Sequence, residues 1–169
     1  MHPASNTKKY VRDKGEKIDQ RSIYVYWKRT SPHPMMTLFD APDRESSCVM
    51  RSRSNTALQS LGLLNETQRI EMSRKLAERL IKSTDDDQRR LDFLYGLLSS
   101  RKPTANEKKA CMKLVATMRE RYKSSEEDAL SLISSGDAPR DQKIPVAELA
   151  AWTQLTTIVL ASDAAILIY

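Results

Sequence analysis

The sequence predicts a mainly α-helical fold of about five to six helices, preceded by an irregular stretch that could contain a strand. From about residue 55 onward, apolar residues recur at intervals of three and four, which is the period of one helix face. Capping signals separate these apolar runs. Only four glycines and two phenylalanines occur among 169 residues, which argues against a β-sandwich or barrel with its many turns.

The chain length is that of one domain with room for a sizeable core. Residues 1–20 are polar and are expected to form an extended or disordered lead-in, so the single helical domain is predicted over 21–169. Its first part holds the run Ile23–Trp27, which could be a short strand or an aromatic helical turn. Pro32 and Pro34 then predict a loop without regular structure.

The first secure helix is expected from about Asn55 to Leu64. Its leucines cover so much of the circumference that we expect the helix to be largely buried. Asn65 is expected to cap the next helix, with Gln68 in the reciprocal capping-box position. That second helix should end near Lys82, because a polar break follows it.

Four further helices are predicted beyond this break. The first begins with acidic residues, which suit the helix dipole, and has an apolar stripe from Leu91 to Leu98. The clearest signal is the capping box Thr104–Glu107, which opens an amphipathic helix. A shorter helix is predicted over 126–133. We expect the last helix, which Pro145 can begin and which contains Trp152 and runs to Leu167, to form the centre of the core.

The net charge of +6 lies mostly near the amino terminus. Residues 1–60 contain 11 Lys and Arg against 6 Asp and Glu, whereas residues 61–169 contain 17 against 16. A basic surplus favours anionic partners such as phosphate, sulfate, polyanionic glycan or nucleic acid, and its small size makes nucleic acid the least favoured. The lysines of the later helices alternate with acidic residues and are expected to form ordinary solvated faces.

No metal or membrane segment is predicted. Cys48 and Cys111 match no metal or redox spacing, and Cys111 falls on an apolar helix face, where a buried thiol is expected. His33 lies between two prolines without a second ligand nearby. The apolar run that ends the chain is interrupted by Asp163 and is too short to span a bilayer.

A charged segment in the irregular stretch is the main candidate site. Carboxylates in different environments can act as acid and base, and clustered arginines can bind sulfate, phosphate or carboxylate. The alternative is an internal carboxylate–arginine network that holds an irregular loop in place. Catalytic residues are not assigned, and the candidate cluster is Asp40, Asp43, Arg44, Glu45, Arg51 and Arg53.

Aromatic residues just before this cluster are a second candidate. Tyr24, Tyr26 and Trp27 could form a stacking platform for a sugar or a base, with Lys28 and Arg29 beside them. The alternative is an aromatic mini-core under the loop. The sequence contains no glycine-rich phosphate loop, GxSxG, HExxH or CxxCH motif.

A motif runs through this stretch and consists of Arg21–Tyr24, Tyr26–Thr30, Phe39–Pro42, Arg44–Glu45, Cys48, Arg51–Arg53, Asn55–Thr56, Leu58–Gln59 and Leu63–Asn65. The motif resembles domain-of-unknown-function family 1553, the planctomycete PSD-one domain. Outside the central stretch, Asn6–Tyr10, Asp13–Glu16 and Arg101–Thr104 are also similar to that family. The sequence departs from the family pattern at Gln20 and Met50, where arginine is usual, and at Ala57, where proline is usual.

This resemblance implies a carboxy-terminal domain of a large exported protein, periplasmic or on the cell surface, often encoded near sulfatases and other polysaccharide-degrading functions. Such proteins often carry a separate c-type cytochrome domain, so haem is implied only there and no cofactor in this chain. No apolar segment follows Met1, and no secretory signal is predicted. The chain therefore looks like a detached terminal portion, and export is implied only if Met1 is not the true start.

Two hypotheses of function follow. The leading one is a non-catalytic accessory or interaction module that contacts upstream domains of a larger protein and an anionic polysaccharide. The alternative is a hydrolase-like enzyme, or part of one, acting on polysaccharide with a site within residues 40–53. The two differ in what Asp40→Asn should do, because a catalytic carboxylate supports turnover and a structural one supports stability.

Overall fold

A computed structural model describes residues 10–25, 27, 31–42 and 47–166. The chain forms two compact units, residues 1–63 and 64–169. The described residues contain α-helices, short 3-10 helices and irregular segments but no strand, which confirms the mainly α-helical prediction. The prediction of a single domain over 21–169 is not tested by this division and stays a prediction.

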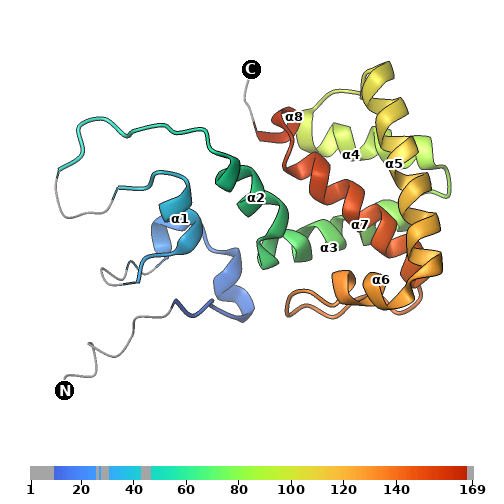
Figure 1. Ribbon diagram of the computed structural model, residues 1–169, viewed down its shortest axis with the longest axis horizontal. Helices are drawn as coiled ribbons and strands as arrows, with labels where there is room; N and C mark the ends of the chain where they lie inside the picture. Colours follow the sequence, from blue (N-terminus) through green and yellow to red (C-terminus); the bar gives the residue numbers. More distant parts are fainter. Residues whose placement is uncertain (1–9, 26, 28–30, 43–46, 167–169) are drawn as a thin grey trace. The chain divides into compact units, whose positions relative to one another are not determined.

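The first unit has little regular structure. Two 3-10 helices, Gly15–Asp19 and Ser22–Tyr24, precede α1, which spans Pro34–Leu38 (Figure 1). The strand alternative for the aromatic run is wrong for Ser22–Tyr24. The Tyr24 backbone N–H bonds to the Arg21 carbonyl at 2.9 Å, so the backbone turns back on itself instead of extending.

The proline-broken segment also contains a helix where a loop was expected. Pro34 is the first residue of α1, a position where its missing N–H would have had no helical partner. His33 caps this helix, because its Nδ1 accepts the backbone N–H of Met35 at 3.2 Å. His33 therefore has a structural role at a helix start.

Helix α2, Ala57–Asn65, occurs where the sequence predicts it, but the expected burial is wrong. Leu58 and Leu61 are 62% and 55% exposed, and the only buried side chain of the helix is Gln59. Within the first unit, α2 approaches α1 at Gly62, where any side chain would collide with Leu38. Leucines on several sides of one helix cannot all face a single neighbour.

The second unit is a compact group of helices. Its helix bounds follow the predicted segments closely, and the predicted capping box of Thr104 and Glu107 is present. The helices are α3 Thr67–Ser83, α4 Asp87–Ser99, α5 Ala105–Ser124, α6 Glu126–Ile133, α7 Val146–Leu160 and α8 Asp163–Ile166.

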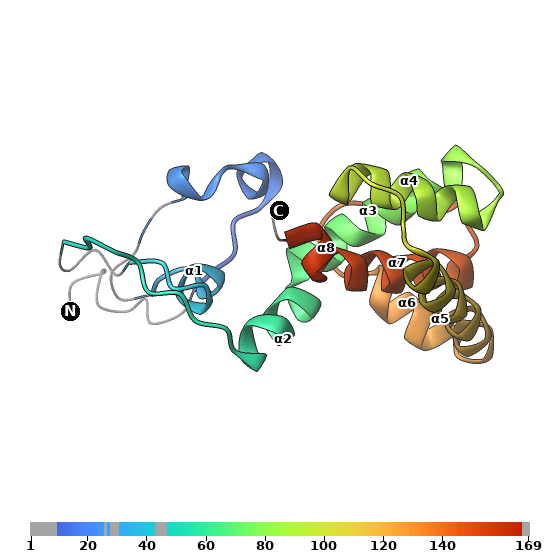
Figure 2. The same ribbon diagram turned by 90° about the horizontal axis from the view of Figure 1, so that it is seen from above.

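Helix α7 is the centre of this unit, with α3, α5 and α6 packed around it (Figures 1 and 2). Trp152 is fully buried in its middle, and Leu149, Leu155 and Val159 continue the buried surface. Burial of an aromatic side chain of this size is a large contribution to stability. The prediction that Trp152 lies at the centre of the core is confirmed.

Two details of these helices differ from the sequence prediction. The cap of α3 is Glu66 and not Asn65, because the Glu66 carboxylate accepts the Arg69 backbone N–H at 2.8 Å. The last helix is also shorter than predicted, since α7 ends at Leu160. Ile166 belongs to the separate helix α8 and is 46% exposed, while Leu167 lies outside the described residues.

The loop between α6 and α7 is held against α3 by charged side chains. The Glu71 carboxylate accepts the backbone N–H groups of Asp137 and Ala138, both at 2.8 Å. The fully buried Arg74 donates to the Ala138 carbonyl at 2.6 Å. Glu78 accepts the Asp141 N–H at 3.1 Å. Side chains on one face of α3 thus provide hydrogen-bond partners for backbone N–H and C=O groups of this loop, which have no partner in regular secondary structure.

Candidate functional site

Hydrogen bonds join Asp40, the first residue of the predicted charged cluster, to Ser54, which directly follows the last one. Asp40 accepts the Ser54 backbone N–H at 2.7 Å, and its two oxygens accept the Ser54 hydroxyl at 2.8 and 3.0 Å. Asp40 has φ 55°, a left-handed conformation that short polar side chains tolerate better than most. The contact joins two residues that are 14 positions apart and defines the two ends of the loop.

These hydrogen bonds also set the chemistry of the carboxylate. The Ser54 backbone N–H, the Ser54 hydroxyl and the nearby Arg51 charge all favour the ionised form, and they lower the pKa of Asp40. An ionised carboxylate whose oxygens already accept hydrogen bonds is suited to holding a loop. It is poorly suited to proton transfer near neutral pH, where a general acid or base needs a pKa closer to 7.

Two further side chains attach the base of this loop to the helices. Arg51 donates from Nη2 to the carbonyls of Phe39 and Asp40, both at 3.3 Å. Gln59 on α2 donates to the Leu38 carbonyl and to the Ser54 hydroxyl, both at 2.9 Å. The buried amide of Gln59 therefore links the ends of the loop to α1 and α2.

An open groove of about 960 Å³ lies along this loop. The exposed side chain of Arg53 makes no hydrogen bond or ion pair with any other residue that the structure describes. Arg51 is also exposed, and Nη2 is its only side-chain atom that forms a hydrogen bond with a residue that the structure describes. The lining residues are Phe39, Asp40, Met50, Arg51, Ser52, Arg53, Ser54 and Gln59.

The structure therefore brings together three of the six predicted site residues, Asp40, Arg51 and Arg53. The other three, Asp43, Arg44 and Glu45, lie outside the described residues.

The predicted aromatic platform is described only in part. Tyr24 is 72% exposed and Trp27 is half-buried. Tyr26 and the neighbouring Lys28 and Arg29 lie outside the described residues.

The two cysteines differ in their exposure to solvent. Cys48 is exposed and Cys111 is buried, each as a free thiol, which confirms the expected burial of Cys111. Burial is the main cause that raises the pKa of Cys111. Across residues 10–25, 27, 31–42 and 47–166, no group of three His, Cys, Asp or Glu side chains could hold a metal ion.

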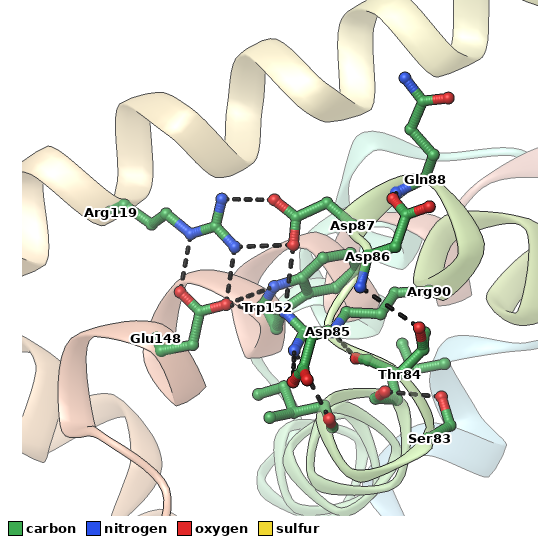
Figure 3. A network of polar contacts seen from close by, with 12 residues as sticks. Ser83, Thr84, Asp85, Asp86, Asp87, Gln88, Arg90, Arg119, Glu148 and Trp152 are labelled. Atoms are coloured by element: carbon green, nitrogen blue, oxygen red, sulfur yellow. Dashed lines mark hydrogen bonds and ion pairs between the residues drawn. The ribbon is translucent and has the colours of Figure 1, made fainter.

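A second charged cluster, which the sequence did not predict, joins three helices of the second unit. Figure 3 shows Arg119 on α5 between Asp87 at the start of α4 and Glu148 at the start of α7. Arg119 makes a fork of two hydrogen bonds to each carboxylate, at 2.6 and 2.8 Å to Asp87 and at 2.6 and 2.7 Å to Glu148. Such paired geometry is the strongest form of this contact.

Buried Arg90 completes the cluster. Its Nη1 donates to Asp87 and to Glu148, both at 3.0 Å, and its guanidinium lies 5.6 Å from the ring centroid of Trp152. Trp152 in turn donates its indole N–H to Glu148 at 3.0 Å.

Two cations and two anions are thus hydrogen-bonded to one another, and exposed Asp85 lies 3.9 Å from Arg90, so the cluster acts as a clamp between helices. The Arg119 hydrogen bond is the largest cause that lowers the pKa of Asp87. Sequence reasoning placed acidic residues at the start of α4, but local patterns carry no signal for a partner 32 positions away.

None of the helices that the structure describes is both long enough and apolar enough to cross a membrane.

Comparison with known proteins identifies a family. Residues 1–115 match the model of PSD1, a protein of unknown function (DUF1553). The match includes the loop with Asp40, Arg51 and Arg53, together with helices α1 to α4 and the first half of α5. No curated protein and no solved structure matched the chain. Because the match covers well over half of the 169 residues, the chain belongs to the PSD1 (DUF1553) family.

Proposed function

We propose that this chain is a non-catalytic accessory module that binds an anionic polysaccharide through the groove beside Arg51 and Arg53. The supporting observation is a division of roles in that groove. Asp40 is committed to Ser54, whereas Arg53 is exposed and makes no hydrogen bond or ion pair with the other described residues. The available charge on the groove is therefore positive.

The chemistry of the lining suits a charged sugar chain. A guanidinium presents a planar fork of N–H donors that matches the oxygens of a carboxylate or sulfate group. Phe39 and Met50 add apolar surface to the same groove, and both are partly or largely exposed. Apolar surface of this kind can cover the C–H faces of sugar rings while the arginines hold the acidic substituents.

The state of Asp40 favours this proposal over the hydrolase alternative. A polysaccharide hydrolase generally needs two carboxyl groups with different pKa values on either side of the scissile bond. The hydrogen bonds of Asp40 to Ser54 lower its pKa, which is the opposite of the raised pKa that a general acid needs. A hydrolase would lose turnover but not stability in Asp40→Asn. We expect that variant to loosen the loop instead, through weaker bonding to Ser54.

Binding of the full chain to a sulfated polysaccharide and to a polyuronate tests the proposal. We expect Arg53→Ala to lower the affinity by about tenfold, since a hydrogen bond to a charged group contributes roughly 1.5–3 kcal/mol. Thermal unfolding should stay unchanged because Arg53 supports no described contact. Arg89→Ala is the control, as Arg89 is an exposed arginine of the second unit. Equal affinity of Arg53→Ala and wild type would reject the groove as the binding site.

We further infer that the module works as the terminal part of a larger exported protein, with upstream domains as partners and any haem on a separate domain. The support for this inference is the family resemblance. Mass spectrometry of the native gene product in its own cells tests it. A longer chain in the exported fraction is expected, and a 19.3 kDa species inside the cell would contradict the inference.

A further inference from the structure

The first half of α5 carries an exposed basic row without acidic residues. Successive members of this row are three, four and four residues apart, so they lie along one side of the helix. The chain has no Asp or Glu between Glu107 and Glu120, which departs from the alternation of charge expected for the later helices. The members of the row, all with exposed side chains, are Asn106, Lys109, Lys113 and Thr117.

The positive charge of this row is not used within the described parts of the protein. The side chains of Lys109 and Lys113 make no hydrogen bond or ion pair with any described residue. Three other lysines of the second unit, Lys75, Lys82 and Lys123, are paired with carboxylates, as in Lys82 with Asp141 at 2.6 Å.

The nearest carboxylate in the sequence is also occupied. Glu107 accepts Arg101 at 2.6 and 2.8 Å and the Thr104 backbone N–H at 2.7 Å, which lowers the pKa of Glu107 to about 2. Glu107 and Arg101 therefore neutralise each other, and the row keeps its own charge.

We propose that this row, here called the α5 row, binds a linear anionic polysaccharide. The ammonium groups of Lys109 and Lys113 would contact sulfate or carboxylate substituents as point charges. The Asn106 amide can both donate to and accept from the hydroxyl groups of a sugar. The Thr117 hydroxyl donates to the Lys113 carbonyl at 3.0 Å, and its oxygen can still accept from a sugar hydroxyl. At 1.5 Å per residue the row is about 17 Å long, enough to follow several sugar rings.

A sugar chain fits this surface better than a nucleic acid. Proteins that bind single strands stack bases on exposed aromatic side chains. The tyrosines closest in sequence, Tyr95 on α4 and Tyr122 on α5, are only 4% and 5% exposed.

The α5 row consists of different residues from the groove beside Arg53 and belongs to the second unit. The proposal therefore does not depend on the groove. A double variant, Arg51→Ala with Arg53→Ala, removes the groove contribution and leaves the α5 row unchanged. Binding that persists in this background, and still depends on Lys109 and Lys113, separates the two proposals.

The test measures binding of the full chain to dextran sulfate, with uncharged dextran as the reference, over a range of salt concentrations. We expect Lys109→Gln with Lys113→Gln to lower the affinity by about tenfold and to reduce the salt dependence by roughly two charges, in the wild-type and the groove-variant backgrounds. Lys123→Gln is the matched control, because Lys123 lies on the same helix and pairs with Glu120 at 3.1 Å. It should bind within about twofold of wild type.

Two results would overturn the proposal. One is equal affinity of the Lys109/Lys113 variant and the Lys123 control. The other is a single-stranded oligonucleotide that binds more tightly than dextran sulfate in a manner that depends on the two lysines, since this would assign the α5 row to nucleic acid. All of the replaced lysine and arginine positions are exposed, so unchanged thermal unfolding verifies that each variant is folded.

Discussion

Gly136 and Gly96 differ in what a side chain would meet. Gly136 has φ +96°, and a Cβ there would collide with the Glu71 carboxylate that holds the α6–α7 loop. Gly96 lies inside α4, and a Cβ there would meet nothing within 4 Å. In the sequence these two glycines look alike, and only the tertiary environment shows that Gly136 is required and that Gly96 can be replaced.

This difference leads to a paired prediction. Gly96→Ala should stabilise the protein by about 0.5–1 kcal/mol, because alanine loses less backbone entropy in a helix. Gly136→Ala should destabilise it by more than about 1 kcal/mol, because both the backbone angle and the Glu71 contact oppose a side chain. Urea unfolding followed by circular dichroism measures both changes. Effects of the same sign would contradict the structural assignment of the two positions.

Asp87 makes stability depend on pH in a defined direction. Its pKa is lowered in the folded state, so its contribution is present above the unfolded value of about 3.9 and is lost as pH falls through the lower folded value. The hydrogen bond from Arg119 is the main cause of this lowered pKa, and the side chains of Arg119 and Asp87 are each about one quarter exposed.

We therefore expect Arg119→Gln to cost about 1–2 kcal/mol at pH 7, after allowance for partial exposure to solvent. The difference from wild type should shrink as the pH falls below about 4, because Asp87 then becomes protonated in both proteins. Urea unfolding at a series of pH values measures it. Arg121→Gln, on the same helix but in a more exposed pair with Asp128, is the control and should change stability little. A pH-independent difference would contradict the assigned role of Asp87.

At the scale of elements, α3 contributes through two faces. One face packs against α7, where the Thr156 hydroxyl donates to the Ser73 carbonyl at 2.9 Å. The other holds the irregular loop between α6 and α7 through Glu71, Arg74 and Glu78. Because these positions recur at helical intervals, they lie along one side of α3.

The buried Glu71 is the most sensitive point of this second face. Glu71→Gln replaces one carboxylate oxygen with an NH2 group. Because NH2 is a donor, it cannot accept the backbone N–H that this oxygen accepts from Asp137 or Ala138. We expect a loss of about 1–3 kcal/mol, the cost of leaving a buried donor without a partner. Amide hydrogen exchange should become faster at Asp137 and Ala138. Glu127→Gln, at an exposed position in α6, is the control, and equal stability of the two variants would contradict this role.

Helix α2 shows the limit of reasoning from one element. Its position was predictable because four leucines follow one another at short intervals between Ala57 and Asn65. Its burial was not predictable, because burial depends on which neighbours surround the helix. In the described structure Gln59 is buried and Leu58 is exposed, since the amide of Gln59 supplies the hydrogen bonds that the loop needs.

At the scale of the whole molecule, the core and the family match have different extents. All apolar side chains that are fully buried among the described residues lie between Ala77 and Val159. The family match ends at residue 115, before α6 and α7. The helices that complete the core of the second unit therefore lie outside the matched region, with Trp152 among them.

Two fragments test this relation. Residues 64–169 should unfold cooperatively with nearly the midpoint of the full chain, because they contain the whole buried core. Residues 1–115 should lack a cooperative transition, since they lack α7 and with it the buried side chain of Trp152. Replacing a buried tryptophan by alanine alone lowers the free energy of unfolding by about 3–5 kcal/mol. Circular dichroism during heating measures both. A large drop in midpoint for 64–169 would instead support the single domain predicted over 21–169.

The sequence by itself determined where helices α2 to α6 and the start of α7 lie, but not helix α1 or the break between α7 and α8. It also determined the capping box at Thr104 and the central place of Trp152, because helical periodicity and caps are encoded over a few neighbouring residues. Only the tertiary structure decided which polar groups meet. Asp40 contacts Ser54 across 14 positions, and Arg119 contacts Asp87 across 32. Such pairs are brought together by the packing of whole elements, and a local pattern carries no information about that distance.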